Sequence, residues 1–312
     1  MIISVRGKRV KLPDFFIVGA AKSGTTSLYY YLVQHPQIFM PSEKEPAFFA
    51  YRELPPHYTI PGVRHDRRIR YKLEDYVKLF RTAKDGQVIG EGSTAYLYTY
   101  NLTIPHIKQI YGNKYKELKI IAILRNPIDR AFSHYLFISR AGGEPLPFAD
   151  AIKPEVIERR IPEARGYDYT GYGMYYNQVK AYMEEFPHTR FYLFEDLKDN
   201  NLIIKDLFGF LDVDKDLNIN TDIKANPSGI PKNRFLVKML LRASIFKSFV
   251  LPKTKVKLAT ARDILLNRFL VKNELDVVLR KKLILIFRDD ILKLQDLLKR
   301  DLSHWLEIKQ NA

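Results

Sequence analysis

The sequence predicts an α/β protein in which a central, mostly parallel β-sheet is flanked by helices and followed by a helical C-terminal annex. Two observations predict this class. Apolar runs alternate with helix-like segments along the first two thirds of the chain, which is typical of parallel sheets covered by helices on both faces. The strongest run, Lys119–Leu124, is apolar at every position after the lysine, as expected of a strand buried on both faces.

The elements are expected in a regular order. Strands are expected at 15–18, 37–40, 87–91, 119–124 and 190–194, and helices from the loop that ends at Ser27 to residue 34, then at 73–80, 128–139 and 176–185. Residues 42–49 are expected to form a loop and residues 51–70 an irregular excursion. The first helix ends at His35, because the residue before Pro36 avoids the helical conformation. The last long helix carries apolar residues at multiples of three to four positions: Leu279, Leu283, Phe287, Leu294 and Leu298.

Length and composition favour one domain. With 312 residues and 46% hydrophobic content, a single domain over 1–312 is expected, with an α/β core at 1–211 and a basic loop and annex at 212–312 packed on it. The chain has no cysteine, which removes disulfides, thiolate metal sites and cysteine nucleophiles and fits a reducing compartment. Residues 1–12 are basic and lack a leader-like apolar stretch, and no run of about 18 apolar residues occurs, so a cytoplasmic protein is expected.

The chain is strongly basic. Its 51 lysines and arginines outnumber 35 acidic residues, which gives a net charge of +16, and the segment 232–272 alone holds eleven basic residues against one acidic residue, Asp263. A basic surface attracts nucleic acid, anionic lipid or acidic substrates. Apolar residues interleave with these charges, so the segment would lie on an anionic membrane, collect an acidic acceptor or form a solvated face, and the sequence leaves these interpretations open.

The most informative stretch lies between the first strand and the first helix. It reads Gly19-Ala20-Ala21-Lys22-Ser23-Gly24-Thr25-Thr26-Ser27. A glycine-bearing turn between a strand and a helix directs backbone N–H groups at a phosphate, as in P-loop-like folds. Nucleoside triphosphatases place a lysine directly after the second glycine of this loop. Here Thr25 follows Gly24, and the only lysine, Lys22, lies inside the loop.

A second motif begins at the carboxyl end of the strongest strand. It reads Leu124-Arg125-Asn126-Pro127-Ile128-Asp129-Arg130-Ala131-Phe132-Ser133-His134-Tyr135. Ligands bind at this edge of open α/β sheets, and Pro127 is tolerated at the start of the next helix. Ser133 lies about two helical turns beyond Arg125. A guanidinium and a hydroxyl would therefore share one phosphate if that helix returns over the same cleft.

Together the two motifs resemble those of sulfotransferases that use 3′-phosphoadenosine-5′-phosphosulfate (PAPS), most closely the glycan-sulfating, heparan-sulfate type and its bacterial relatives. The first loop matches the family's 5′-phosphosulfate-binding loop, and the second motif matches its 3′-phosphate-binding motif. The resemblance implies PAPS as the donor, adenosine 3′,5′-bisphosphate (PAP) as the product and no required metal. It implies that the donor is held by Ala21, Lys22, Ser23, Gly24, Thr25, Thr26, Ser27, Arg125, Ser133 and, in a basic loop that closes over it, Lys232.

A third segment resembles the part of the family that carries the general base. It reads Lys44-Glu45-Pro46-Ala47-Phe48-Phe49, and Glu45 matches the glutamate that takes the proton of the acceptor hydroxyl. The two phenylalanines would give Glu45 apolar surroundings that raise its pKa. Lys22 would stabilise the charge that develops on the leaving oxygen. Some members have histidine where this chain has Ala47.

Weaker matches extend the resemblance over most of the chain. Residues 90–96 resemble a segment that lines the acceptor cleft, with Thr94 in place of the usual proline, and Arg300–Trp305 resembles the family's ending. The seven histidines are scattered without the spacing of metal ligands. Among them, His35 is expected to be a structural turn residue and not a base.

The expected function is transfer of a sulfuryl group from PAPS to a hydroxyl of a carbohydrate or glycolipid, with no nucleic-acid partner. Peripheral attachment to an anionic membrane through 232–272 is compatible with it. Two alternatives stay open. A nucleotide-dependent kinase on the same fold would use Phe191–Asp196 as its acidic strand end, although the missing lysine after Gly24 counts against it. A basic membrane- or nucleic-acid-binding module would account for the charge alone.

Overall fold

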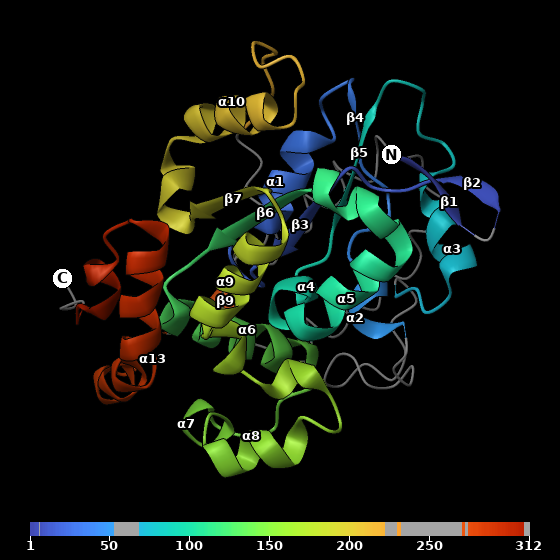
Figure 1. The fold of residues 1–312 in the computed structure, drawn as a ribbon. Coiled ribbons are helices and arrows are strands. Elements are labelled where there is room, and N and C mark those ends of the chain that lie inside the picture. The colour runs from blue at the N-terminus through green and yellow to red at the C-terminus, as the bar shows by residue number, and fades with distance from the viewer. Residues whose placement is uncertain (6, 53–68, 222–229, 232–269, 272–273, 309–312) are drawn as a thin grey trace.

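The computed structural model describes residues 1–5, 7–52, 69–221, 230–231, 270–271 and 274–308 (Figure 1). The strands of its central sheet are β3 (Phe15–Gly19), β4 (Ile38–Phe39), β5 (Val88–Gly92), β6 (Lys119–Leu124) and β7 (His188–Leu193). They lie in the order β4-β5-β3-β6-β7, and every neighbouring pair is parallel. The parallel α/β architecture predicted from the sequence is confirmed.

Alternate residues of the two central strands point into two separate apolar cores. From β3, Phe16 and Val18 join one core, whereas Phe15 and Ile17 join the other. Strand β6 alternates in the same way. Because successive side chains of a strand point to opposite faces, both faces of the sheet are covered. This burial explains why the two strands are near-continuous apolar runs in the sequence.

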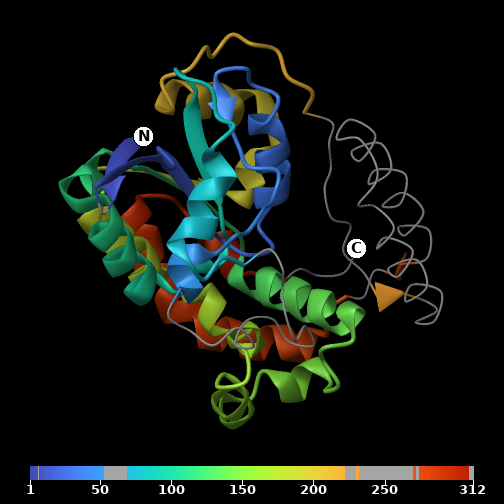
Figure 2. The same cartoon turned by 90° about the vertical axis from the view of Figure 1, so that its right-hand side faces the viewer.

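Helices cover the two faces. They are α1 (Thr25–Leu32), α2 (Phe48–Tyr51), α3 (Leu73–Val77), α4 (Ala95–Tyr98), α5 (Tyr100–Tyr111), α6 (Pro127–Ala141), α7 (Phe148–Ala151), α8 (Pro154–Arg160), α9 (Tyr175–Glu185), α10 (Asn200–Phe210) and α13 (Val277–Leu298). Leu28 of α1 and Leu207 of α10 lie in one core, and Ile128 of α6 and Phe287 of α13 in the other. Figure 2 shows the first pair of helices on one side of the sheet and the second pair on the other.

The predicted C-terminal helix is confirmed as α13. Leu283, Phe287, Ile291 and Leu294 are buried along one side of it, and it packs on α9 and α6. Lys232 and most of the basic segment 232–272 lie outside the described residues. Within the ranges given above, no helix has the length and apolar character needed to cross a bilayer.

Several elements differ from the prediction. The strand expected at 190–194 is not buried throughout, because β7 is an edge strand and only its last two residues are buried. Helix α2 begins within the loop expected at 42–49, since Phe48 and Phe49 pack into the core. The N-terminus forms a hairpin of two antiparallel strands, β1 (Ile2–Val5) and β2 (Lys8–Lys11). No strand is predicted from the sequence in this region.

Candidate active site

The β3–α1 loop, residues 20–24, ends at the N-terminus of α1. Gly24 caps the helix with φ of 90°, and a Cβ at this position would lie 2.6 Å from the side chain of Leu197. Glycine is therefore favoured by the left-handed backbone, and a larger residue would also have to displace the Leu197 side chain. The first N–H groups of α1 have no intrahelical acceptor, and a helix N-terminus favours an anion. The loop has the local geometry of an anion site.

The ammonium group of Lys22 lies among other positive charges. Its Nζ is 4.5 Å from the centre of the Phe137 ring on α6, and the guanidinium of Arg140 lies 5.9 Å from the same ring centre. Burial, together with the charges of Arg140, Arg125 and Lys44, lowers the pKa of Lys22 from 10.5 to about 8. Four cations that disfavour one another in this way suit a ligand with several negative charges.

Arg125 connects the two predicted phosphate motifs. Its Nη1 donates a hydrogen bond to the backbone oxygen of Lys22 at 3.0 Å. On its other side, the guanidinium lies 4.8 Å from the centre of the Phe194 ring, which is exposed. Arg125 follows β6 and Phe194 follows β7, so the two groups meet at the carboxyl edge of the sheet. This is the edge at which open α/β sheets bind ligands.

Ser133 is buried on α6, one helical turn before Phe137. Residues four apart lie on the same side of a helix, so Ser133 is on the side of α6 that meets Lys22. Arg140 follows one turn later on that side. The structure therefore joins Arg125 to Lys22 and places Ser133 on the side of α6 that faces Lys22. The sequence motifs do not include Arg140, although its spacing of seven from Ser133 places it on the same side of the helix.

Glu45 lies in the loop between β4 and α2, beside the β3–α1 loop. Its backbone N–H donates to the Gly92 oxygen at 3.1 Å, and one of its carboxylate oxygens, Oε2, accepts from Thr94 Oγ1 at 3.0 Å. The neighbouring Lys44 donates to Thr26 Oγ1 on α1 at 2.6 Å and lies 3.6 Å from Glu45 Oε1. This carboxylate thus has polar partners, and Phe48 and Phe49 are buried in the apolar core.

A buried carboxylate is connected to the Glu45 loop by hydrogen bonds. Glu91 of β5 is inaccessible to solvent and accepts hydrogen bonds from Ser93 Oγ at 2.5 Å, Tyr96 OH at 2.7 Å and Tyr76 OH at 2.9 Å. Ser93 Oγ in turn accepts from the N–H of Ala47 at 2.9 Å. Burial raises the pKa of Glu91 from 4.5 to about 7, against the three hydroxyl donors. Sequence reasoning missed this role of Glu91.

Glu91→Gln is expected to change how stability depends on pH. Between pH 4.5 and 7 the unfolded chain loses the Glu91 proton while the folded chain keeps it, so the wild type loses stability as pH rises. The glutamine variant does not titrate there. Its unfolding free energy relative to wild type should therefore rise by on the order of 3 kcal/mol over this range. Urea unfolding at a series of pH values measures the difference, with exposed Glu117→Gln as the control. Parallel curves for wild type and Glu91→Gln would contradict the assignment.

Two carboxylates at the end of β7 are engaged by protein groups. Glu195 Oε1 accepts from Trp305 Nε1 at 3.0 Å, and Asp196 pairs with Arg300 at 2.8 Å. These are the acids that the kinase alternative would use to hold a metal. His35 is buried, and its ring nitrogens contact the Asp214 oxygen at 2.9 Å and the Gln37 N–H at 3.1 Å, which agrees with a structural turn residue.

Fold and site together define a parallel α/β protein with a group of cations at the carboxyl edge of its central sheet. The family model described as "Sulfotransferase family" matches residues 13–160. The crystal structure of a sulfotransferase from Alicyclobacillus acidocaldarius superposes on this chain with a TM-score of 0.71 and a sequence identity of 30%. The match covers 96% of this chain and 100% of that one. The chain belongs to the sulfotransferase family.

Two curated relatives match part of this chain. Membrane-associated sulfotransferase kil1 of Dictyostelium discoideum is 33% identical over 151 residues, which are 47% of this chain and 28% of that protein. Carbohydrate sulfotransferase 15 of Rattus norvegicus is 29% identical over 168 residues, which are 43% of this chain and 29% of the relative. The matches thus span less than a third of the length of these relatives.

Proposed function

We propose that this chain transfers a sulfuryl group from PAPS to a hydroxyl group of a carbohydrate. The observation that carries the proposal is the hydrogen bond from Arg125 to the backbone of Lys22, because it joins the two phosphate-binding motifs at one sheet edge. Lys22 and the three cations around it suit a donor that bears a phosphosulfate at one end and a phosphate at the other.

The residues at the site fit this donor. The hydroxyl of Ser23 is fully buried near the Tyr175 hydroxyl, and in the described part of the chain its Oγ has no hydrogen bond of normal geometry. A phosphate oxygen would supply a better-aligned partner. Residues 21–27 would hold the 5′-phosphosulfate through backbone N–H groups and hydroxyls, and Arg125 with Ser133 would hold the 3′-phosphate. The exposed ring of Phe194 offers a surface for the base.

The proposed chemistry divides between Glu45 and Lys22. Bound PAPS supplies the sulfuryl group and the leaving phosphate. Glu45 takes the proton of the acceptor hydroxyl as that oxygen bonds to sulfur and the bond from sulfur to the bridging phosphate oxygen breaks. Lys22 stabilises the negative charge that remains on the bridging oxygen with the electron pair of the broken bond. No step in this scheme calls for a metal.

We propose a carbohydrate acceptor because one of the relatives is named as a carbohydrate sulfotransferase. A cytoplasmic location and attachment to an anionic membrane through 232–272 stay predictions. Lys232 as a donor ligand is likewise a prediction, since it lies outside the described residues.

Isothermal titration calorimetry with PAP and with ATP plus Mg²⁺ tests the donor. The chain is expected to bind PAP at one site per molecule and at least about tenfold more tightly than ATP, because only PAP carries a phosphate for Arg125 and Ser133. Arg125→Ala should lose most of this preference, and exposed Arg159→Ala should keep it. Tighter binding of ATP than of PAP would favour the kinase alternative and overturn the proposal. Labelled sulfate from PAPS, offered with candidate glycans, then identifies the acceptor.

A further inference from the structure

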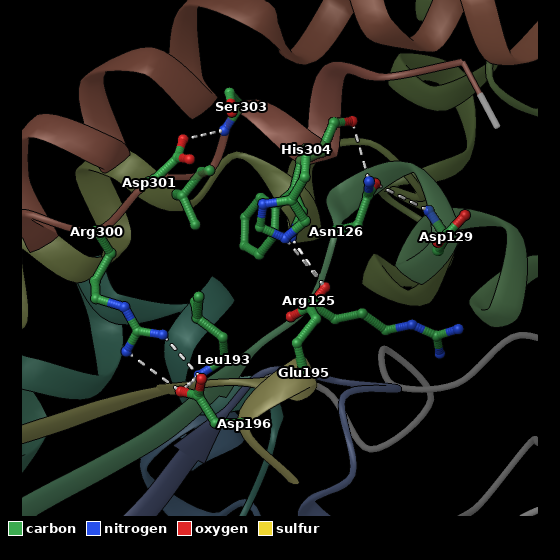
Figure 3. A network of polar contacts seen from close by, with 12 residues as sticks. Arg125, Asn126, Asp129, Leu193, Glu195, Asp196, Arg300, Asp301, Ser303 and His304 are labelled. Atoms are coloured by element: carbon green, nitrogen blue, oxygen red, sulfur yellow. Dashed lines mark hydrogen bonds and ion pairs between the residues drawn. The ribbon is translucent and has the colours of Figure 1, made fainter. Parts of the chain in front are cut away.

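The last described turn of the chain, Ser303–Leu306, is held against the donor site (Figure 3). We name it the C-terminal turn. It contains Trp305, which is the only tryptophan of the chain and is fully buried. Three contacts fix its approach: Arg300 pairs with Asp196 at 2.8 Å, and the N–H groups of Leu302 and Ser303 donate to Gln295 at 3.0 Å and Asp301 at 2.9 Å.

Trp305 ties together the ends of two neighbouring strands. Its backbone oxygen accepts from Asn126 Nδ2 at 3.0 Å, and its ring N–H donates to Glu195 Oε1 at 3.0 Å. Strands β6 and β7 are paired at their last residues, Leu124 and Leu193. Asn126 and Glu195 each lie two residues beyond this pair, so a single residue bridges the segments that follow the two strands.

One donor-site residue lies between the end of each strand and the residue that contacts Trp305. Arg125 lies between Leu124 and Asn126, and Phe194 lies between Leu193 and Glu195. The Arg125 guanidinium rests on the Phe194 ring. Figure 3 shows the Arg125 side chain extending away from the C-terminal turn, so the turn supports it without competing for its ligand.

The backbone of Arg125 is held from a second direction by the same cluster. Its carbonyl oxygen accepts from Tyr175 OH at 3.1 Å, and the Tyr175 ring lies 6.5 Å from the Trp305 ring. Asn126 also caps α6, the helix that carries Ser133, by accepting from the N–H of Ile128 at 2.9 Å. Trp305 thus restrains Asn126, which directly follows Arg125 in the chain and caps the helix that carries Ser133. Arg125 and Ser133 are the two residues assigned to the 3′-phosphate.

We propose that Trp305 is a positioning residue for the 3′-phosphate site, acting through Asn126 and Glu195. The inference rests on the proposed function, because it concerns how Arg125 meets the donor. Fixing two ligand-binding groups before the ligand arrives lowers the entropic cost of binding. The benefit should fall on ligands that carry a 3′-phosphate and not on those that lack it.

The test compares PAP with adenosine 5′-monophosphate, which lacks the 3′-phosphate. Asn126→Ser keeps a helix cap and adds no charge but removes the amide donor to Trp305. Trp305→Phe keeps a buried ring but removes the ring N–H. Each variant is expected to weaken PAP binding about five- to tenfold and to change the affinity for adenosine 5′-monophosphate less than about twofold. Asn113→Ser is the matched control, because Asn113 is exposed and lies just before the amino end of β6. It should change neither of the two affinities.

The readouts separate positioning from a general loss of structure. Partial unfolding lowers the number of binding sites per chain in calorimetry, whereas lost positioning changes the ratio of the two dissociation constants. Equal effects on both ligands, or no effect of either variant, would overturn the inference while leaving wild-type PAP binding intact. A wild type that does not bind PAP would overturn the proposed function as well.

Discussion

Lys22→Ala is expected to lower the rate of sulfate transfer by on the order of 100- to 1,000-fold, with a much smaller loss of PAP affinity. The ammonium lies against Phe137 in a partly buried group of cations, where charges act more strongly than in water. The negative charge on the leaving oxygen develops only as the bond to sulfur breaks. Loss of the lysine should therefore reduce kcat more than binding. Transfer from labelled PAPS measures the rate, and calorimetry measures the affinity.

Two further variants test whether the charge of Lys22 accounts for the lower rate of Lys22→Ala. Lys205→Ala removes an exposed lysine from α10 and should leave the rate unchanged. Lys22→Arg keeps the charge and should recover part of the rate. Because the pKa of Lys22 is about 8, wild-type affinity for PAP should fall as pH rises through that value, and Lys22→Ala should lack this dependence. A normal rate of transfer in Lys22→Ala would remove Lys22 from the mechanism.

The centre of the fold could be predicted because local sequence determines it. Strand β6 is predicted at 119–124 and lies there, since a strand buried on both faces must be apolar at successive positions. Helix α13 is predicted from the spacing of its apolar residues, and those residues face the core. In both cases the positions that the element buries are apolar in the sequence.

The elements that escape prediction depend on distant contacts. Helix α5 contains Pro105, which argues against a helix, yet Ile104 and Ile107 are buried in the core and packing outweighs propensity. The exposed residues of β7 follow from its place at the sheet edge, which the order of elements along the chain does not give. Likewise, β1 and β2 are short and gain their stability from pairing with each other.

The candidate site divides in a similar way. Lys22, Arg125 and Glu45 each lie in a continuous motif, so their chemistry could be predicted from neighbouring residues. Thr94 first appears as a departure from the family pattern, and only the fold shows that its hydroxyl donates to Glu45. The role of Glu91 also requires the fold, because its three donors include Tyr76, which lies fifteen residues away in sequence.

Glu45→Gln is expected to reduce sulfate transfer by on the order of 100- to 10,000-fold while PAP affinity stays within about twofold of wild type. The amide has nearly the size of the carboxylate, and its oxygen can still accept from Thr94 Oγ1. The backbone hydrogen bond to Gly92 does not involve the side chain. What the variant loses is the capacity to take a proton and the negative charge that pairs with Lys44. Single-turnover transfer from labelled PAPS to the acceptor measures this step directly.

Glu43 provides a matched control for this variant. It lies two residues before Glu45 in the same loop, but it pairs with Arg70. Glu43→Gln removes the same charge from the same loop and should leave transfer near the wild-type rate. The φ values of 62° for Glu45 and 47° for Ala47 are unusual for residues other than glycine, so contacts with Gly92, Ser93 and Thr94 must hold the loop in place. Since the glutamine retains these contacts, a normal rate in Glu45→Gln would mean that another group accepts the proton.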